Sequence, residues 1–391
     1  MLRDKRIWSL RTLSAIEQGF RRHRELIGSR NEQGCGAFKA SFTSRPQPQD
    51  FGHSDLLLMD ISLYAARAED IDVLSTYQIA SFFHRHKSIT KDACNSAAAN
   101  ITGSPVSPTL VQGETSYTVA ADADQRPKVV QFRNSALNIE IIHQARQTYR
   151  EFVPNCECRG MLGDVYVYEM DFVPGVAFSR ARRHLLARGL EQRLLRTVQD
   201  FARFFASAWI NRVELKQPPD AARELFAHYS QILDQLSQGL PERFQPKLDE
   251  VRKGLPLLFR SDYPMVLNHD DLLEMNIHVD NVTGGITGIV DWADAKIAPF
   301  GTSLGGLETV LGVQTSSCWH FHPDHNLLRT HFWETFYEII GYLPDSDRRA
   351  IEVGRLFGLF RTHGFDRRPE KENASPVEEG DLVCLEAFCL R

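Results

Sequence analysis

The sequence predicts an α+β protein with two lobes, a small antiparallel sheet followed by a larger and mainly helical part. Strand-like runs separated by polar turns occupy residues 109–132. After Asn134 the apolar periodicity becomes that of a helix, and Pro174-Gly175 interrupts the chain before a mostly helical remainder. The 391 residues suit two or three domains or one bilobal unit, at roughly 150 residues per domain. We place the boundary between the lobes near residues 171–175.

The first 50 residues differ in composition from the rest of the chain. They are rich in Arg at first, and later in Ser, Pro and Gln. Little of such a segment would pack into a core, so we expect residues 1–50 to be disordered or removed by processing. An Arg-rich amino terminus is also typical of an organelle transit peptide, which keeps mitochondrial targeting open. Residues 51–171 then form the N-terminal lobe and residues 172–391 the C-terminal lobe.

Helices are expected on both sides of the first strands. Apolar residues between positions 55 and 95 indicate one or two short helices that brace the N-terminal lobe. The polar turn at 122–125 separates two strands. The helix that follows them has an apolar stripe in which every fourth residue is apolar, and it should end near Pro154. This stripe consists of Leu137, Ile141, Ala145 and Tyr149.

Composition narrows the class of partner. The apolar fraction of 42% and the charged fraction of 24% are ordinary for a globular chain. A formal net charge of -5 provides no basic field for nucleic acid or an anionic membrane, and no Lys/Arg stripe with interleaved aromatic residues occurs. A small molecule or a protein is therefore the favoured substrate.

The sequence predicts a cytoplasmic protein with free thiols. No stretch approaches the roughly 18 apolar residues of a membrane span, and the first thirty residues lack the apolar core of a secretory signal. The seven cysteines include no C-x-x-C pair, so neither a disulfide framework nor a zinc site is expected. The histidines that follow Cys318 are too irregularly spaced to indicate zinc.

The densest group of polar side chains in an apolar setting lies within residues 265–292. A strand leads into a loop that carries His269, Asp271 and Asn276, and a hairpin then returns Asp291 to the side of that loop. Phosphoryl transfer requires one base for the attacking hydroxyl and hard oxygen ligands for Mg²⁺. The spacing therefore predicts Asp271 as the base, and Asn276 and Asp291 as magnesium ligands.

The pattern H-x-D-x-x-x-x-N, followed fifteen residues later by an apolar strand end and D-W, resembles the aminoglycoside phosphotransferase and choline kinase family. It resembles especially the fungal branch of that family. The resemblance implies a protein kinase-like fold, ATP and Mg²⁺ as cofactors, a small-molecule acceptor, and His269 and Asp271 as catalytic residues. It extends from about residue 109 to about residue 364, but only residues 269–292 are specific. Trp292 differs from the Asp-Phe-Gly of protein kinases.

The resemblance also assigns the N-terminal lobe to nucleotide binding. Gly113 and Ser116 border the turn whose backbone N–H groups would reach the phosphates. Residues 170–175 resemble the family's apolar strand that ends at a Pro-Gly break. Backbone groups near Asp171 and Phe172 are therefore expected to bind the adenine edge.

The family spacing puts the phosphate-binding cation at Gln131 or Arg133, which share one face of a strand. We favour Arg133, because the α- and β-phosphates need a fixed positive charge. Glu140, early in the next helix, is expected to hold that cation, as the family's first-helix Glu does. If Gln131 occupies the position instead, ordinary ATP chemistry is not expected.

Position 270 departs from the family pattern, because it is Asp where Gly is usual. The five-residue spacing to Asn276 selects Asp271 and not Asp270 as the base. The additional carboxylate is expected either to contact a cationic acceptor or to be a solvated loop acid.

Three functions stay open from the sequence alone. The leading hypothesis is transfer of the γ-phosphoryl group of ATP to a hydroxyl or amine of a small metabolite. A protein-substrate kinase is the second, although the Asp-Phe-Gly and Ala-Pro-Glu landmarks are missing. The third is a catalytically silent binding protein, which a Gln131 in place of the cation would favour.

Overall fold

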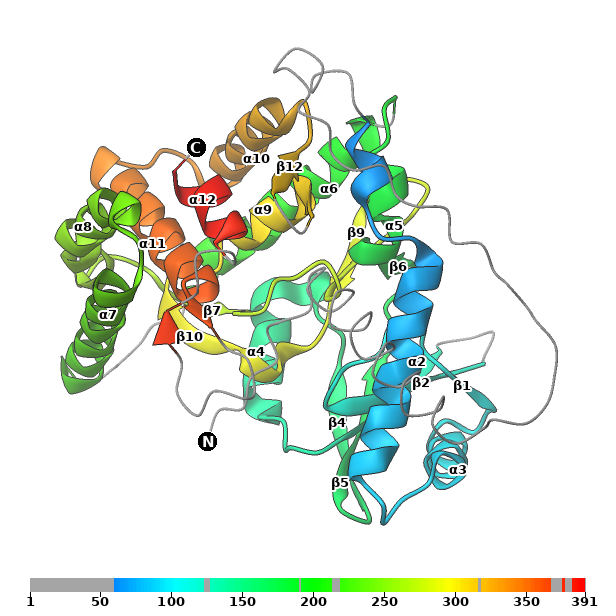
Figure 1. Cartoon of the computed structure of the whole chain (residues 1–391). Helices are drawn as coiled ribbons and strands as arrows, with labels where there is room; N and C mark the ends of the chain where they lie inside the picture. The colour runs from blue at the N-terminus through cyan, green and yellow to red at the C-terminus, as the bar shows by residue number, and fades with distance from the viewer. Residues whose placement is uncertain are drawn as a thin grey trace, which may run out of the picture.

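The computed structural model has an antiparallel sheet in its N-terminal part and helices in most of its C-terminal part, which confirms the predicted fold class (Figure 1). The structure describes residues 60–122, 127–189, 191–212, 219–315, 318–366, 375–376 and 382–390. The predicted disordered or processed segment 1–50 lies outside these residues. No helix of the described residues is long and apolar enough to cross a membrane.

Two helices brace the sheet, as the sequence predicted. After the 3-10 turn η2 (Ile61–Tyr64) come α2 (Ala68–Arg85) and α3 (Lys91–Thr102). The Thr90 hydroxyl caps α3 by accepting from the Ala93 N–H at 3.1 Å. Phe82 of α2 is fully buried and packs with Tyr117 of the sheet in a small core of its own.

The N-terminal sheet has the strand order β1-β2-β3-β5-β4, and all of its neighbours are antiparallel. On β3, Val130 and Phe132 face the core under α2 and α3, and the alternation of a strand turns Gln131 and Arg133 to the other face. The strands are β1 (Val106–Pro108), β2 (Ser116–Ala121), β3 (Lys128–Arg133), β4 (Cys156–Leu162) and β5 (Val165–Asp171).

Helix α4 (Ile139–Tyr149) joins the sheet to the larger core. Ala145 and Tyr149 of its apolar stripe are buried there, and the Tyr149 hydroxyl donates to the backbone oxygen of Leu267. The helix ends at Tyr149 in the 3-10 turn η3 (Arg150–Phe152), slightly before the predicted end at Pro154. Helix α4 therefore links the N-terminal lobe to the C-terminal lobe through Tyr149.

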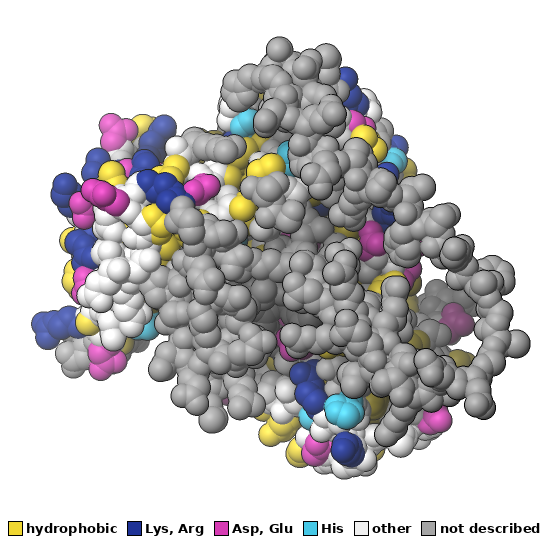
Figure 2. Space-filling model, in the orientation of Figure 1, with side chains coloured by type: hydrophobic (Ala, Val, Ile, Leu, Met, Phe, Trp, Pro, Cys, Tyr) yellow, Lys and Arg dark blue, Asp and Glu magenta, His cyan; other side chains and the backbone are white. Residues whose placement is uncertain are grey.

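The C-terminal lobe packs helices around one apolar core. The aromatic stripe of α6 is buried, and α10 runs along it, with the Phe205 and Phe332 rings 6.0 Å apart. The helices are α5 (Phe178–Leu185), α6 (Glu191–Ile210), α7 (Pro219–Gly239), α8 (Gln245–Gly254), α9 (Gly306–Val310), α10 (His325–Ile340), α11 (Asp345–His363) and α12 (Val383–Cys389). The 3-10 turns are η4 (Glu242–Phe244), η5 (Leu255–Phe259) and η6 (Trp292–Asp294). Figure 2 shows basic and acidic side chains interspersed at the left of the view, where Figure 1 places α7 and α8.

Two short sheets position the polar loop that the sequence singled out. β7 (Met265–Asn268), which leads into the loop, pairs with β10 (Lys296–Pro299), and β8 (Ile277–Val279) follows the loop. β8 lies between β6 (Val176–Ala177) and β9 (Ile286–Ile289). The remaining strands are β11 (Gly312–Gln314), β12 (Trp319–Phe321), β13 (Phe365–Asp366) and β14 (Ser375–Pro376).

Candidate active site

A cavity of about 460 Å³ lies between the open face of the sheet and the loop that follows β7. It is lined by residues of β2, β3 and β5, by the chain that leaves β5, and by the loop and the end of β9. All of the sequence-predicted site residues except His269 and Glu140 line it. They are Gly113, Ser116, Arg133, Asp171, Phe172, Asp271, Asn276 and Asp291.

Asp271 and Asn276 are joined as the five-residue spacing predicted. The Asn276 Nδ2 donates to Asp271 Oδ2 at 3.1 Å and to the Asp271 backbone oxygen at 2.9 Å. Because the amide nitrogen faces Asp271, the amide oxygen points away from it and is available as a hard ligand. Asp271 is only 6% exposed, so its contacts hold the carboxylate in one place.

The hairpin of β8 and β9 returns Asp291 to the loop. The Val290 N–H donates to the Asn276 backbone oxygen at 2.9 Å, which brings the residue before Asp291 beside Asn276. Asp291 has a φ of 61°, in the left-handed region that non-glycine residues rarely adopt. Its half-buried carboxylate accepts from Arg133 Nη1 at 3.2 Å, a contact between the two lobes.

His269 is fully buried below the loop and does not line the cavity. Its Nδ1 accepts from the Asp271 N–H at 3.3 Å, and its Nε2 donates to the Val290 backbone oxygen at 2.8 Å. Burial lowers the pKa of His269, so the ring is neutral near pH 7. The residue therefore connects the loop to β9, and this placement corrects the expectation of a directly catalytic histidine.

Arg133 and Gln131 are neighbours in the cavity and not alternatives for one position. The Arg133 side chain is 1% exposed, and its Nη1 also donates to Gln131 Oε1 at 2.9 Å. Its Nε and Nη2 have no hydrogen-bond partner among the residues that the structure describes. Buried donors are nearly always matched, so this guanidinium is suited to a polyanionic ligand.

Glu140 does not form the ion pair that was expected with Arg133. It is exposed in the first turn of α4, whereas Arg133 points across the cavity to Asp291. A carboxylate in the first turn of a helix interacts favourably with the helix dipole and needs no other partner. The assignment of Glu140 as the residue that holds the cation is therefore not met in this structure.

The chain that leaves β5, near which backbone groups were expected to bind the adenine edge, lines the large cavity at Asp171 and Phe172. The Asp171 N–H donates to the Asn155 oxygen at 3.1 Å, and the Phe172 N–H donates to the Pro127 oxygen at 3.2 Å. Both amides are engaged within the protein, so neither is available to an adenine edge. Burial alone would raise the pKa of Asp171, but hydrogen bonds from Lys128 and the Asn155 amide hold it below its ordinary value.

The turn over the cavity is held by a side chain that the sequence did not reveal. Gln112 is buried; its Nε2 donates to the Thr118 oxygen at 2.8 Å and its Oε1 accepts from the Thr118 N–H at 3.0 Å. A Cβ at Gly113 would lie 2.7 Å from the Ser116 Oγ, so glycine suits this tight turn. The amide of Gln112 therefore replaces a missing strand neighbour for Thr118 and shapes the loop.

Asp270 is neither of the two things that were expected of it. Its side chain is 1% exposed and is paired with Arg361 and Lys296, so it is not a solvated loop acid and does not await a cationic acceptor. The sequence did not reveal Arg361 as the partner of Asp270, because it lies 91 positions away. A basic residue directly after the apolar run of α11 was the available signal.

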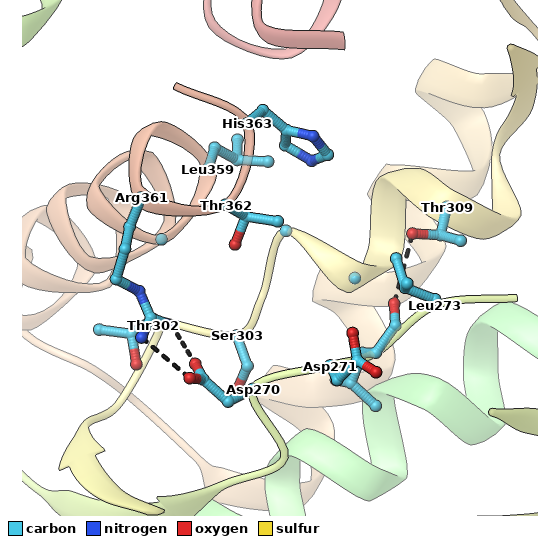
Figure 3. Close-up of a pocket in the computed structure, with 14 residues that line it drawn as sticks. Asp270, Asp271, Leu273, Thr302, Ser303, Thr309, Leu359, Arg361, Thr362 and His363 are labelled. Atoms are coloured by element: carbon cyan, nitrogen blue, oxygen red, sulfur yellow. Dashed lines mark hydrogen bonds and ion pairs between the residues drawn. The ribbon is translucent and has the colours of Figure 1, made fainter. Parts of the chain in front are cut away.

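A second, smaller cavity of about 40 Å³ adjoins the loop on the side of α9 and α11 (Figure 3). Asp271 and Leu273 line both cavities. A volume of this size holds a few water molecules, at about 10–15 Å³ each on this measure. Asp271 is thus accessible from two directions, from the large cavity and from the small one.

Metal binding by a cluster of His, Cys, Asp and Glu has no support in the described ranges, where no group of three or more such residues is suitably placed. The Cys318 Sγ does lie 3.1 Å from His320 Nε2, but as a pair only. Asn276 and Asp291 at the large cavity supply one amide oxygen and one carboxylate, which suit Mg²⁺ if the other ligands are phosphates and water.

The sheet, the helical lobe and the polar loop together define the class of fold. A five-stranded antiparallel sheet, a helical lobe and a polar loop between them form a kinase-like fold. The family model described as the phosphotransferase enzyme family matches residues 110–309, just over half of the chain. The chain belongs to this family and is a phosphotransferase enzyme.

Solved structures of aminoglycoside phosphotransferases are similar at low identity. Spectinomycin phosphotransferase APH(9)-Ia, solved with ADP and spectinomycin, is 15% identical over 77% of this chain and 93% of its own, with a TM-score of 0.41. APH(4)-Ia is 15% identical over 69% and 90%, with a TM-score of 0.43. The GDP complex of aminoglycoside 2'-phosphotransferase-IIIa is 13% identical over 73% and 90%, with a TM-score of 0.43. None of the curated proteins matches the sequence.

Proposed function

We propose that this enzyme transfers the γ-phosphoryl group of ATP to a hydroxyl or amine of a small molecule, with Asp271 as the base. The observation that carries the proposal is the position of Asp271, which lines both cavities and is hydrogen-bonded to Asn276. A nucleotide in the large cavity and an acceptor at the small one would therefore meet at the same carboxylate.

Each residue of the site has one task in this proposal. Asp271 accepts the proton of the acceptor group and orients its oxygen or nitrogen for attack. Asn276 and Asp291 would hold Mg²⁺, which when bound neutralises phosphate charge. Arg133 binds the phosphates through the nitrogens that lack a partner among the described residues. His269 keeps the loop in place from below.

The ion pair between Arg133 and Asp291 supports this division of tasks. It holds the cation and one metal ligand at the same point of the cavity, 3.2 Å apart. A nucleotide phosphate would compete with Asp291 for Arg133, and a bound Mg²⁺ would then offset the charge of the Asp291 carboxylate. Arg133 lies beside Gln131 in the cavity, which supports a catalytic protein over a silent binding protein.

In this proposal the acceptor binds at the small cavity. Thr302 and Ser303 line it between β10 and α9, and Leu359 and Thr362 line it from α11. Its volume of about 40 Å³ admits a hydroxymethyl or aminomethyl arm and not a large ring. We therefore expect the acceptor to place one such arm beside Asp271, with the rest of the molecule outside the small cavity.

The test is ADP release by the purified full-length protein with ATP and Mg²⁺, followed over a panel of alcohols and amines. Turnover with at least one acceptor is expected. Asp271→Asn should reduce it by about 10²–10⁴-fold, the usual contribution of a general base. Asp262→Asn, at an exposed carboxylate outside the site, should leave it unchanged. Full turnover by Asp271→Asn would show that another group is the base.

A further inference from the structure

The residue before the proposed base has an unusual backbone. Asp270 has a φ of 64°, in the left-handed region, which Gly enters freely and Asp only at some cost. The resembling family usually has Gly at this position. The conformation is therefore the one that Gly would supply, but here a side chain is attached to it.

That side chain is fully engaged inside the protein. Arg361 Nη1 donates to Asp270 Oδ2 at 2.9 Å, and Arg361 Nη2 donates to Asp270 Oδ1. Lys296 Nζ lies 2.7 Å from Asp270 Oδ2. Figure 3 shows the two parallel contacts between Arg361 and Asp270 at the side of the small cavity. A bidentate arrangement of this kind fixes the direction of the carboxylate as well as its position.

The helix that carries Arg361 is tightly packed against its neighbouring segment. Arg361 is in the last turn of α11, and two glycines of that helix pack against the segment after β10. A Cβ at Gly358 would lie 2.0 Å from the Thr302 oxygen, and one at Gly354 would lie 2.7 Å from the Phe300 oxygen. Helix and segment are thus in backbone contact, which leaves the Arg361 side chain little freedom to follow a moving loop.

We propose that Asp270 and Arg361 are positioning residues that aim the carboxylate of Asp271. The two residues before Asp271 attach the loop to two different elements, His269 to β9 and Asp270 to α11, and His269 also accepts from the Asp271 N–H. With both attachments the peptide before Asp271 has one orientation, and the side chain of Asp271 has one direction. The inference depends on the proposed function, because it assumes that Asp271 is the base.

The experiment compares kcat and KM for ATP in variants of the full-length protein. Asp270→Asn keeps a side chain that tolerates the left-handed backbone but weakens the bidentate contact, and it should lower kcat by about 10–100-fold, as a misplaced catalytic group does. KM for ATP should change by less than about threefold, because Asp270 does not line the nucleotide cavity. Arg361→Lys keeps the charge but not the fork, so its kcat should lie between those of wild type and Arg361→Met.

Arg355→Met is the matched control, since Arg355 is on the same helix and pairs with Glu352 at 2.7 Å and with Glu308 of α9 at 3.7 Å, two carboxylates outside the loop. It should lower the melting temperature without lowering kcat. A folded Asp270→Asn with wild-type kcat would overturn the positioning role.

If Asp270→Asn does not fold, Lys296→Gln decides the question, because Lys296 is 45% exposed and its loss should be tolerated. A decrease of kcat by about two- to fivefold at constant KM is expected from the loss of one of the contacts to the same carboxylate, and an unchanged kcat would overturn the proposal. Absence of turnover in wild type with every acceptor would overturn the proposed function, and this role with it. The positioning role alone would be overturned if the wild type turned over normally, Asp271→Asn lost turnover and Asp270→Asn kept the wild-type kcat.

Discussion

The two lobes each contain a buried arginine that contacts an aspartate of residues 265–292, but the two ion pairs have different geometries. Arg361 of the helical lobe presents both terminal nitrogens to the two oxygens of Asp270. Arg133 of the sheet reaches Asp291 through one nitrogen only, at 3.2 Å. Both aspartates have left-handed backbones, with φ values of 64° and 61°.

This difference separates a structural contact from a ligand site. In the Asp270 pair, the fork of the arginine is matched by the fork of the carboxylate, which leaves little for a ligand to bind. In the Asp291 pair, two nitrogens of Arg133 lack a partner among the described residues and lie at the large cavity. The same residue type therefore holds a loop carboxylate in one lobe, and in the other we propose that it binds phosphate.

The largest effect on stability is expected at Arg361. Arg361→Met leaves the buried Asp270 without its bidentate partner, and loss of one member of a buried pair costs about 3–5 kcal/mol. Urea unfolding should show this decrease, whereas Arg133→Met should show a smaller one. Equal losses in the two variants would mean that the pairs are equivalent in the unliganded protein.

His278, which lines the large cavity, tests how much it costs to protonate a buried histidine there. Burial lowers its pKa from 6.5 to about 4. Because the folded pKa lies below the unfolded one, the unfolded chain binds the proton first, and this contribution to stability is lost as the pH falls from about 6.5 to about 4. At 1.36 kcal/mol per pKa unit the loss is about 3 kcal/mol.

His278→Gln removes this proton linkage. Between pH 7 and pH 4 the variant should lose about 3 kcal/mol less unfolding free energy than the wild type. The measurement is urea unfolding at several pH values in that range. Identical pH profiles would show that the ring is protonated as easily in the folded protein as in the unfolded chain.

Arg133 should matter chiefly for the nucleotide. Arg133→Met is expected to weaken ATP binding by about 10–100-fold, since a hydrogen bond to a charged group contributes about 1.5–3 kcal/mol. Isothermal titration of ATP with Mg²⁺ measures this directly. Arg361→Met serves as the control, because Arg361 does not line the large cavity and its loss should leave ATP affinity nearly unchanged. Normal affinity in Arg133→Met would exclude it as the phosphate-binding cation.

Glu140 should give the smallest effect. Exposed in the first turn of α4, it makes no contact with Arg133, so Glu140→Gln is expected to change stability by less than about 0.5 kcal/mol and ATP affinity not at all. Chemical unfolding and ATP titration are the two measurements. A marked loss of ATP affinity would mean that Glu140 pairs with Arg133 once a nucleotide is bound. Each lobe would then hold its buried arginine with a carboxylate.

Sequence reasoning succeeded where the relevant contacts are local. The strand and turn pattern predicted the sheet, and the apolar stripe that ends at Tyr149 predicted α4. The loop was expected to place Asp271 and Asn276 together, and the two side chains are hydrogen-bonded. It failed for Glu140 and for Asp270, because the partner of each depends on a neighbour from another element.

The sequence by itself determined the fold class, the family and the loop that carries Asp271, because these follow from periodicity and from spacings of a few residues. Only the tertiary structure decided which charges are paired. Arg133 and Asp291 are 158 positions apart, and Asp270 and Arg361 are 91 apart. Whether such residues meet depends on how the lobes and helices pack, and local patterns carry no record of that packing.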